Sequence, residues 1–392
     1  MNLPRTSLYI HIPFCSSFCD YCDFYSVLAE SKKIDSFLEA LVTDIKRQIE
    51  YFGVKELLTV YIGGGTPSVL GEKINIIFDA LKSFSPQEFT VEANPESLTE
   101  EFLLACKNGG VNRLSLGVQS FCEASRVAVG RIGEEFSRRR RGAENAEEEG
   151  RGVLEGGLEL AARFFPGGLS VDLIAGLPFQ DEKVLLDDIR RVLEFKPAHV
   201  SLYSLSVESG TVLEEKIKNR SVVLPDADTA DAIWLAGRDA LLKAGFEHYE
   251  VSNFALPGKR CIHNMRYWQM LGWMGAGPAA SGTIIDEVTG TAIRYTYPCD
   301  VDGYIWAVNS EQLTKSNEQL GSLLNKNEFL KECMLMGFRC IDGPDTQLFK
   351  RRFGFTAEEC IPKTLALWKG RDKMLFLNQF LADAFEEAEM YA

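Results

Sequence analysis

The sequence lacks any long apolar run, and no stretch approaches the roughly 18 consecutive apolar residues of a membrane-spanning helix. Its start also lacks the pattern of a signal peptide, because an apolar alternation begins within the first few residues. The 10 cysteines show no regular pairing, which argues against a disulfide scaffold and for a reducing compartment. These absences predict a cytoplasmic protein.

Positive charge is scarce as well. The chain has 42 Lys and Arg against 56 Asp and Glu, and its net charge of −14 disfavours a nucleic-acid-binding surface. What the chain does have is length and apolar content: 392 residues, 46% of them hydrophobic, can build a sizeable core. That length fits about two or three domains.

The densest chemistry lies in the first thirty residues. Residues 7–12 alternate between apolar and polar side chains and end at Pro13, which predicts a strand followed by a loop. Cys15, Cys19 and Cys22 lie in that loop, and three thiolates so close together suit an iron–sulfur cluster. Because a cubic cluster normally takes four ligands, one iron would stay open to a cofactor, as at a catalytic zinc. The alternatives are cysteines that only pack, or zinc, whose usual second ligand pair is absent from this sequence.

The spacing Cys-x-x-x-Cys-x-x-Cys resembles that of the radical S-adenosylmethionine (SAM) superfamily. The resemblance implies that Cys15, Cys19 and Cys22 hold a [4Fe–4S] cluster. It also implies that SAM chelates the open iron and is cleaved homolytically when the cluster is reduced. The implied fold is a partial (β/α)6 barrel, open on one side.

The chain's own periodicity independently predicts an α/β fold. Five further strands are expected after the first, at 57–62, 88–93, 113–118, 169–175 and 199–205. Helices are expected between them at 34–52, 74–81, 99–106 and 183–193. Six strands that alternate with helices predict a parallel sheet with functional residues at the carboxyl ends of the strands.

The rhythm changes after residue 210. We expect a helix at 226–244, a strand-like alternation at 246–254 followed by the segment 267–273, a polar linker at 309–327 and mostly helices at 327–392. The predicted domains are therefore a radical SAM core barrel (1–210), a C-terminal α+β extension (211–310) and a small, mostly helical C-terminal domain (311–392).

Residues 131–157 interrupt the barrel pattern. They contain Arg138–Arg141 and then Glu147–Glu149, without a clear apolar period, which is typical of a solvated insertion. The arginines could touch phosphate or RNA, although the acidic run would offset them. No Lys occurs between Lys107 and Lys183, so an error of reading frame in this region is a second interpretation.

Glycines or polar residues end several predicted strands. Gly63–Pro67 brings backbone without Cβ atoms to a strand end, either for a ligand or simply for a tight turn. Glu92 can accept hydrogen bonds from ribose hydroxyls or be a surface charge. Gln119 can donate and accept, and Arg131 can grip a carboxylate. Asp172 lies within an apolar strand, where burial is costly unless the acid binds a ligand or is satisfied structurally.

Five segments together resemble the oxygen-independent coproporphyrinogen oxidases and their relatives, the HemW family of heme chaperones. They are Tyr-x-His-Ile-Pro-Phe-Cys at 9–15, Gly-Gly-Gly-Thr-Pro at 63–67, Gly-Val-Gln-Ser-Phe at 117–121, Val-Asp-Leu-Ile-x-Gly-Leu-Pro at 171–178 and His-Asn-x-x-Tyr-Trp at 263–268. The resemblance implies SAM contacts at Tyr9, Tyr21, Gly64, Gly65, Thr66, Glu92, Gln119, Arg131 and Asp172.

Three features of this sequence resemble those of the chaperone branch of the family. The decarboxylases carry a further cysteine where this chain has Phe24, and a longer segment before the first cysteine. The third feature is His263 with Tyr267 and Trp268, which resembles a heme-associated motif. A neutral imidazole is a good axial ligand of heme iron, and the two rings offer flat faces, but a lone His can also be structural.

The resemblance implies heme as ligand, apo-hemoproteins as recipients, peripheral contact with membrane respiratory proteins and a homodimer. Two alternatives stay open. One is an enzyme that decarboxylates coproporphyrinogen III to protoporphyrinogen IX, and the other is a radical SAM enzyme that modifies RNA. The chain departs from the family at Gly133, where a His is usual, and at Pro278, near the usual Ala-His-Gly.

Overall fold

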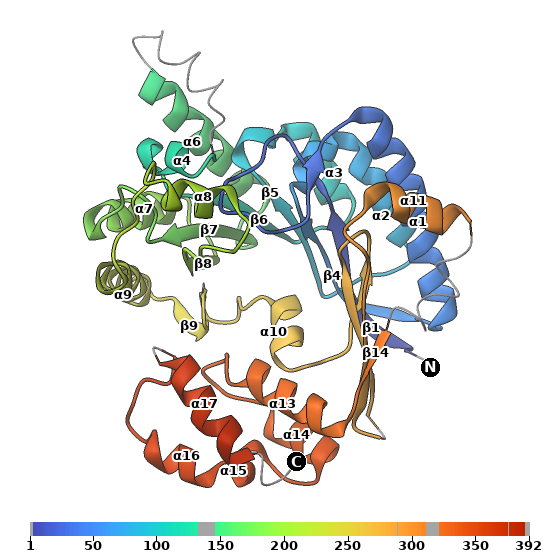
Figure 1. Ribbon diagram of the computed structural model, residues 1–392. Helices are drawn as coiled ribbons and strands as arrows, with labels where there is room; N and C mark the ends of the chain where they lie inside the picture. The colour runs from blue at the N-terminus through green and yellow to red at the C-terminus, as the bar shows by residue number, and fades with distance from the viewer. Residues whose placement is uncertain (1–2, 132–145, 288, 311–320, 375, 389–392) are drawn as a thin grey trace.

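A computed structural model describes residues 3–131, 146–287, 289–310, 321–374 and 376–388. Its main element is a nine-stranded sheet, six strands of which run parallel and follow the chain order. These six are β1 (Arg5–Ile12), β4 (Glu56–Gly64), β5 (Glu88–Ala93), β6 (Arg113–Gln119), β7 (Leu169–Ala175) and β8 (His199–Ser204). The predicted α/β architecture of a partial barrel is confirmed (Figure 1).

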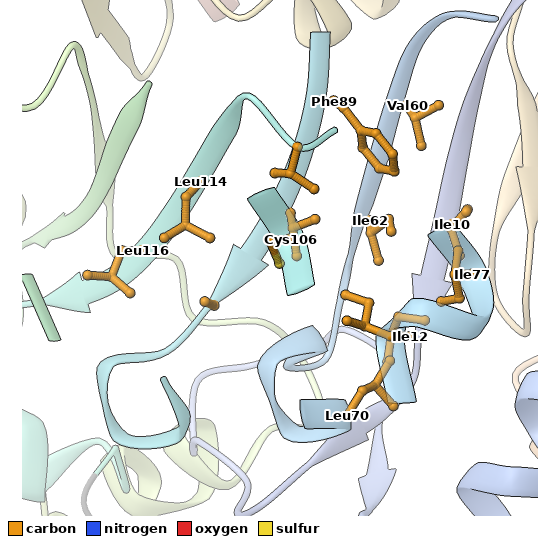
Figure 2. Close-up of a cluster of buried hydrophobic side chains, with 14 of the residues drawn as sticks. Ile10, Ile12, Val60, Ile62, Leu70, Ile77, Phe89, Cys106, Leu114 and Leu116 are labelled. Carbon is orange, nitrogen blue, oxygen red and sulfur yellow. The ribbon is translucent and has the colours of Figure 1, made fainter. Parts of the chain in front are cut away.

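Helices cover the outer face of this sheet (Figure 1). They are α1 (Ser31–Tyr51), η1 (Pro67–Ile74), α2 (Asn75–Leu81), α3 (Glu100–Asn108), α4 (Glu123–Ala128), α6 (Ala146–Phe164), α7 (Glu182–Glu194) and α9 (Ala227–Lys243). The apolar strand residues Ile10 and Ile62 lie beside Leu70 and Ile77 of the helical layer, and Leu114 lies near Cys106 of α3 (Figure 2). Because side chains alternate along a strand, the polar residues between them face the barrel interior.

The segment after residue 210 extends the sheet at both edges. Strand β11 (Met274–Ala276) pairs in parallel with β1, while β10 (Asn253–Ala255) pairs antiparallel with β8 and β9 (Glu247–Glu250) with β10. The expectation of one strand over 246–254 is therefore wrong. A turn at residues 251–252 divides it into a hairpin, and the apolar alternation continues across that turn.

A second sheet of three antiparallel strands was not predicted. It contains β12 (Ser281–Asp286), β13 (Thr291–Thr296) and β14 (Gly321–Leu324). Strand β14 falls inside the expected polar linker 309–327, so the linker prediction is wrong for these four residues, whose backbone pairs with β13. In the chain, α11 (Val301–Asn309) lies between β13 and β14, and it packs on α1 of the barrel.

The C-terminal segment is helical, as predicted for its described residues. Its helices are α13 (Lys326–Gly337), α14 (Thr346–Phe353), α15 (Ala357–Cys360), α16 (Pro362–Leu367) and α17 (Leu377–Ala388). They enclose a separate core with Phe329, Trp368 and Phe380 and lie beneath the barrel in Figure 1. The domain boundaries at 210 and 310 stay predictions.

The charged segment 131–157 is described only in part. Arg138–Arg141 and Gly133 lie outside the described residues, while residues 146–157 belong to α6. Leu154 of this helix and Leu158, which follows the segment, are buried in the barrel core, so the end of the segment packs against the protein. In the part of the chain that the structure describes, no helix has the length and apolar character needed to cross a membrane.

Candidate metal and cofactor site

The loop that carries the three cysteines is closed at its base by a short parallel ladder. Strand β2 (Phe14–Cys15) pairs with β3 (Val27–Leu28), and the Ala29 N–H donates to the Cys15 carbonyl over 3.0 Å. Cys15, Cys19 and Cys22 are free thiols. Among the described residues, no three His, Cys, Asp or Glu side chains are arranged to hold a single ion. Cysteines of a cubic cluster bind different irons, so they need not converge on one point.

Two donors point at the cysteine sulfurs. The Thr66 hydroxyl lies 3.5 Å from Cys15 Sγ, and Arg131 Nη1 lies 3.8 Å from Cys19 Sγ. Burial raises the pKa of Cys15, and it raises the pKa of Cys22 to about 11. Metal coordination deprotonates a thiol outright, and the two donors then stabilise the thiolate charge. This donor set fits a [4Fe–4S] cluster.

The glycines at the end of β4 allow β1 and the cysteine loop to approach closely. A Cβ atom on Gly64, whose φ is 112°, would lie 2.6 Å from the His11 ring. A Cβ on Gly65 would lie 2.7 Å from the Phe14 carbonyl oxygen and 3.0 Å from Cys15 Sγ. The Gly65 N–H donates to the Ile12 carbonyl over 2.8 Å. Glycine is therefore required here by close packing against β1 and the cysteine loop, and not only by the turn itself.

Glu92 is held directly beside this glycine edge. One carboxylate oxygen accepts a hydrogen bond from the Tyr61 hydroxyl (2.6 Å), and the other accepts from the Gly64 N–H (3.1 Å). Burial, followed by the nearby Asp172, raises the pKa of Glu92 to about 7. A carboxylate oxygen can accept more than one hydrogen bond, so each retains capacity for a ligand hydroxyl.

Gln119 and Arg131 meet over Gly117 of β6. The carbonyl of Gly117 accepts from Arg131 Nη2 (2.6 Å), and a Cβ on Gly117 would lie 2.9 Å from Gln119 Nε2. Gln119 has a left-handed φ of 67°, at the place where the register between β6 and β7 shifts. A non-glycine residue in this region carries strain, which is typical of functional positions.

Two ionic groups complete this side of the site. Asp172 pairs with Gly117 across the strands and accepts from the Ser115 hydroxyl at 3.2 Å, while burial raises its pKa. Arg131 lies 3.7 Å from Glu96, and its Nε has no partner among the described residues. The structure thus brings the predicted glycines, Glu92, Gln119, Arg131 and Asp172 to one edge of the barrel.

The two predicted tyrosines lie in different surroundings. The Tyr9 hydroxyl is 3.0 Å from His11 Nδ1 in the barrel interior, with its ring 6.2 Å from that of Tyr61. Tyr21 packs under the cysteine loop against a small cluster that includes Leu213. Burial raises the pKa of both phenols.

Three residues of the site were missed by the sequence reasoning. His11 Nε2 lies 2.9 Å from the Tyr25 carbonyl and ties β1 to the cysteine loop. Tyr61 donates to Glu92, and Asn94 Nδ2 donates to the Thr66 hydroxyl over 3.0 Å. The alternation of β1 and β4 could have placed His11 and Tyr61 in the interior, beside Tyr9.

The predicted heme residues lie elsewhere, at the amino ends of the strands. They belong to α10 (Ile262–Trp268). The first backbone N–H groups of this helix donate to the Glu88 carboxylate at the start of β5, and the His263 N–H does so over 2.8 Å. His263 is 1% exposed, with Nδ1 2.7 Å from the Thr59 hydroxyl and Nε2 2.7 Å from the Tyr267 hydroxyl. Burial lowers its pKa to about 3, which keeps the imidazole neutral.

Trp268, the last residue of α10, faces the C-terminal helices. The guanidinium of Arg339 lies 5.1 Å from the centre of its ring, and Trp268 lines a small pocket together with Cys333 and Phe349. Of the predicted heme residues, Trp268 therefore lies away from the predicted SAM residues, whereas the His263 ring lies 5.1 Å from the ring of Tyr61, the residue that donates to Glu92.

The chain resembles known proteins in family and fold. The model of the Radical SAM superfamily matches residues 9–192. The heme chaperone HemW of Lactococcus lactis is 34% identical over 358 residues, which cover 90% of this chain and 86% of that protein. HemW of Escherichia coli is 36% identical over 72% of this chain and 71% of its own length. The mitochondrial radical S-adenosyl methionine domain-containing protein 1 of Mus musculus is 33% identical over 86% of this chain and 73% of its own length.

A solved structure gives the same fold. Coproporphyrinogen III oxidase (HemN) from Escherichia coli aligns with a TM-score of 0.76 and 20% identity, over 97% of this chain and 90% of that one. At this identity the likeness establishes the architecture and leaves the activity open.

Proposed function

The chain belongs to the HemW family of heme chaperones within the radical SAM superfamily, and on this premise we propose that it binds heme and delivers it to apo-hemoproteins. The observation that carries the proposal is that its likeness to named heme chaperones extends over most of the chain and so beyond the superfamily core. A cytoplasmic location, a homodimer and contact with membrane respiratory proteins belong to the same proposal.

The cofactor part of the proposal assigns the cluster to Cys15, Cys19 and Cys22. When bound and reduced, a [4Fe–4S] cluster supplies the electron for homolytic cleavage of SAM. Thr66 and Arg131 would stabilise the thiolates, and Glu92 would accept hydrogen bonds from the ribose. Gln119 and Asp172 offer further polar groups along the same edge. In a chaperone these interactions would serve assembly or gating.

Phe24 supports the chaperone over the decarboxylase. It occupies the position of the decarboxylases' further cysteine, and its side chain is 66% exposed. A phenyl ring cannot bind a metal ion, so no ligand is available at that position. The net charge of −14 supports the same choice over an RNA-modifying enzyme.

Heme ligation by His263 carries a structural condition. Both ring nitrogens already have hydroxyl partners, Thr59 at Nδ1 and Tyr267 at Nε2. Iron needs a free nitrogen lone pair, so His263 can bind it only if one of these contacts opens. We propose that the Tyr267 contact opens, because rotation of the Tyr267 side chain would free Nε2 without moving the helix, whereas Nδ1 faces Thr59 of β4.

The test is an anaerobic heme titration of cluster-loaded protein, followed by absorbance. Wild type should saturate, and His263→Ala should bind at least about tenfold more weakly, since an axial ligand is lost. His199→Ala is the matched control. His199 is also buried between two hydroxyls, Ser170 and Tyr249, each 2.8 Å from a ring nitrogen.

The possible outcomes separate the parts of the proposal. Equal weakening in both variants would indicate damage to the barrel interior and would remove His263 as ligand. Wild type without saturable heme binding would refute the chaperone function. The next assay would then be anaerobic conversion of coproporphyrinogen III.

A further inference from the structure

The cysteine loop is held a second time, away from its base, by Asp20. The Asp20 N–H donates to the Val129 carbonyl and its own carbonyl accepts from the Leu213 N–H, each over 2.9 Å. Its carboxylate pairs with Lys216 Nζ at 2.5 Å. Asp20 lies between Cys19 and Cys22, so one residue connects the cysteines to the end of α4 and to α8 (Val212–Lys218).

The same contacts reach Arg131. Lys216 Nζ also donates to the Ala128 carbonyl over 3.4 Å. A Cβ atom on Gly130, whose φ is 67°, would lie 2.6 Å from the Asp20 carboxylate. Gly130 immediately precedes Arg131, whose guanidinium approaches Cys19 Sγ. Asp20 therefore packs directly against the turn that delivers Arg131 to the cysteine loop.

The ion pair is shielded from solvent. The side chains of Asp20 and Lys216 are 15% and 33% exposed. Tyr21, which follows Asp20 in the chain, and Ile217 of α8 pack against the apolar cluster that contains Leu213. An ion pair with limited exposure is screened less than a surface pair, and loss of one partner leaves the other charge poorly solvated.

We propose that Asp20 and Lys216 are positioning residues that hold Cys19 and Cys22 in the shape the cluster requires. Helix α8 lies after the 9–192 segment matched by the superfamily model, so an element outside that segment would complete the cluster site. The inference rests on the cluster role proposed for Cys15, Cys19 and Cys22.

The test uses Asp20→Asn, Lys216→Met and the variant that combines these two changes. Lys218→Met is compared with all three. Lys218 is the control because it lies on the same helix but pairs with Glu214, at 2.7 Å, within α8. Far-UV circular dichroism would verify the fold of each protein. The measurements are iron content after anaerobic reconstitution, the rate of cluster loss in air, the reduction potential, and hydrogen exchange of the loop amides without metal.

Each single variant should lose its cluster about fivefold faster than wild type, as expected for a partly buried ion pair. The double variant should be no worse than the singles, because both remove the same interaction. The loop amides should exchange faster in the metal-free variants as well. Lys218→Met should match wild type in every measurement.

Two results would overturn the proposal. In the first, the single variants shift the reduction potential in opposite directions and retain the cluster like wild type, which indicates a charge effect without positioning. In the second, all variants match Lys218→Met, which indicates an ordinary surface pair. Wild type that binds no iron would refute the proposed cluster instead, while the exchange measurement would still report on the Asp20–Lys216 contact.

Discussion

Glu92 and His263 are buried polar side chains at opposite ends of the barrel strands, and they differ in how completely the protein satisfies them. At the carboxyl ends of the strands, Glu92 accepts one hydrogen bond on each oxygen and retains capacity for more. Single buried atoms without a partner among the described residues occur at both ends, such as Arg131 Nε and Trp268 Nε1, so they do not distinguish the two ends. At the amino ends, both ring nitrogens of His263 have hydroxyl partners, and its backbone N–H donates to the Glu88 carboxylate.

Burial alone does not distinguish these ends. It raises the pKa of Glu92 to about 7 and lowers the pKa of His263 to about 3, so each residue is pushed toward its neutral form. The difference lies in unused hydrogen-bonding capacity. A group with capacity to spare can gain from a ligand, while a saturated group must first lose a protein contact. On this comparison we propose that Glu92 binds a cofactor and that His263, in this conformation, supports the structure.

The sharpest test of this comparison replaces one cysteine at each end. Cys19→Ser should lower bound iron at least about tenfold, because the cluster depends on thiolate ligands. Cys261→Ser should retain wild-type iron, since Cys261 is fully buried beside Glu88, with Sγ 3.4 Å from that carboxylate. Iron analysis and absorbance after anaerobic reconstitution provide the measurement. Loss of iron in Cys261→Ser alone would reverse the assignment of the two ends.

A second pair of variants separates stability from cofactor affinity. His263→Ala should lower the free energy of unfolding by about 2–4 kcal/mol, because it leaves a cavity and strands the Thr59 and Tyr267 hydroxyls. Glu92→Gln should cost less than about 1 kcal/mol, because an amide can keep contacts to Tyr61 and Gly64. Its effect should appear in SAM affinity, weakened about tenfold or more by loss of charge-assisted hydrogen bonds.

Urea unfolding of the metal-free proteins and SAM titration of the cluster-loaded proteins measure these two effects. The comparison fails if His263→Ala weakens SAM binding as much as Glu92→Gln does, or if Glu92→Gln is the less stable variant.

The sequence predicts the residues at the carboxyl ends of the strands better than those at the amino ends, for a physical reason. Parallel strands end at a shared edge, so Gly64, Glu92, Gln119 and Asp172 could be grouped as soon as their strands were recognised. The contacts of His263 join it to Thr59, a residue in a distant part of the chain, and no local periodicity encodes them. The same holds for Asp20, whose partner Lys216 lies far along the chain.

Local signals also failed where two elements share one pattern. The apolar alternation continues through the turn of the β9–β10 hairpin, so one strand was expected instead of two. Strand β14 owes its conformation to pairing with β13 and falls in a segment whose composition suggested a linker. In both cases tertiary pairing, which propensity does not measure, decides the structure.

Glu92 should also give the stability of the protein a pH dependence. Its pKa is about 7 in the folded protein and near its ordinary 4.5 when unfolded, so the folded state retains the proton between these values. The stability from Glu92 is therefore fully present below pH 4.5 and is lost as the pH rises through about 7. Between pH 5 and 8, the free energy of unfolding of wild type should fall relative to Glu92→Gln by about 2 kcal/mol.

Urea unfolding of both metal-free proteins at several pH values gives this difference directly. Asp44 and Glu250 also have raised pKa values, about 6 and about 7, but both proteins share them, so their contributions cancel. If the two stability curves run parallel, the Glu92 carboxyl is ionised throughout this range and its site is better solvated than the structure indicates. If the curves diverge, the carboxyl is held neutral until a ligand supplies further hydrogen bonds, and this spare capacity is the property that distinguishes Glu92 from His263.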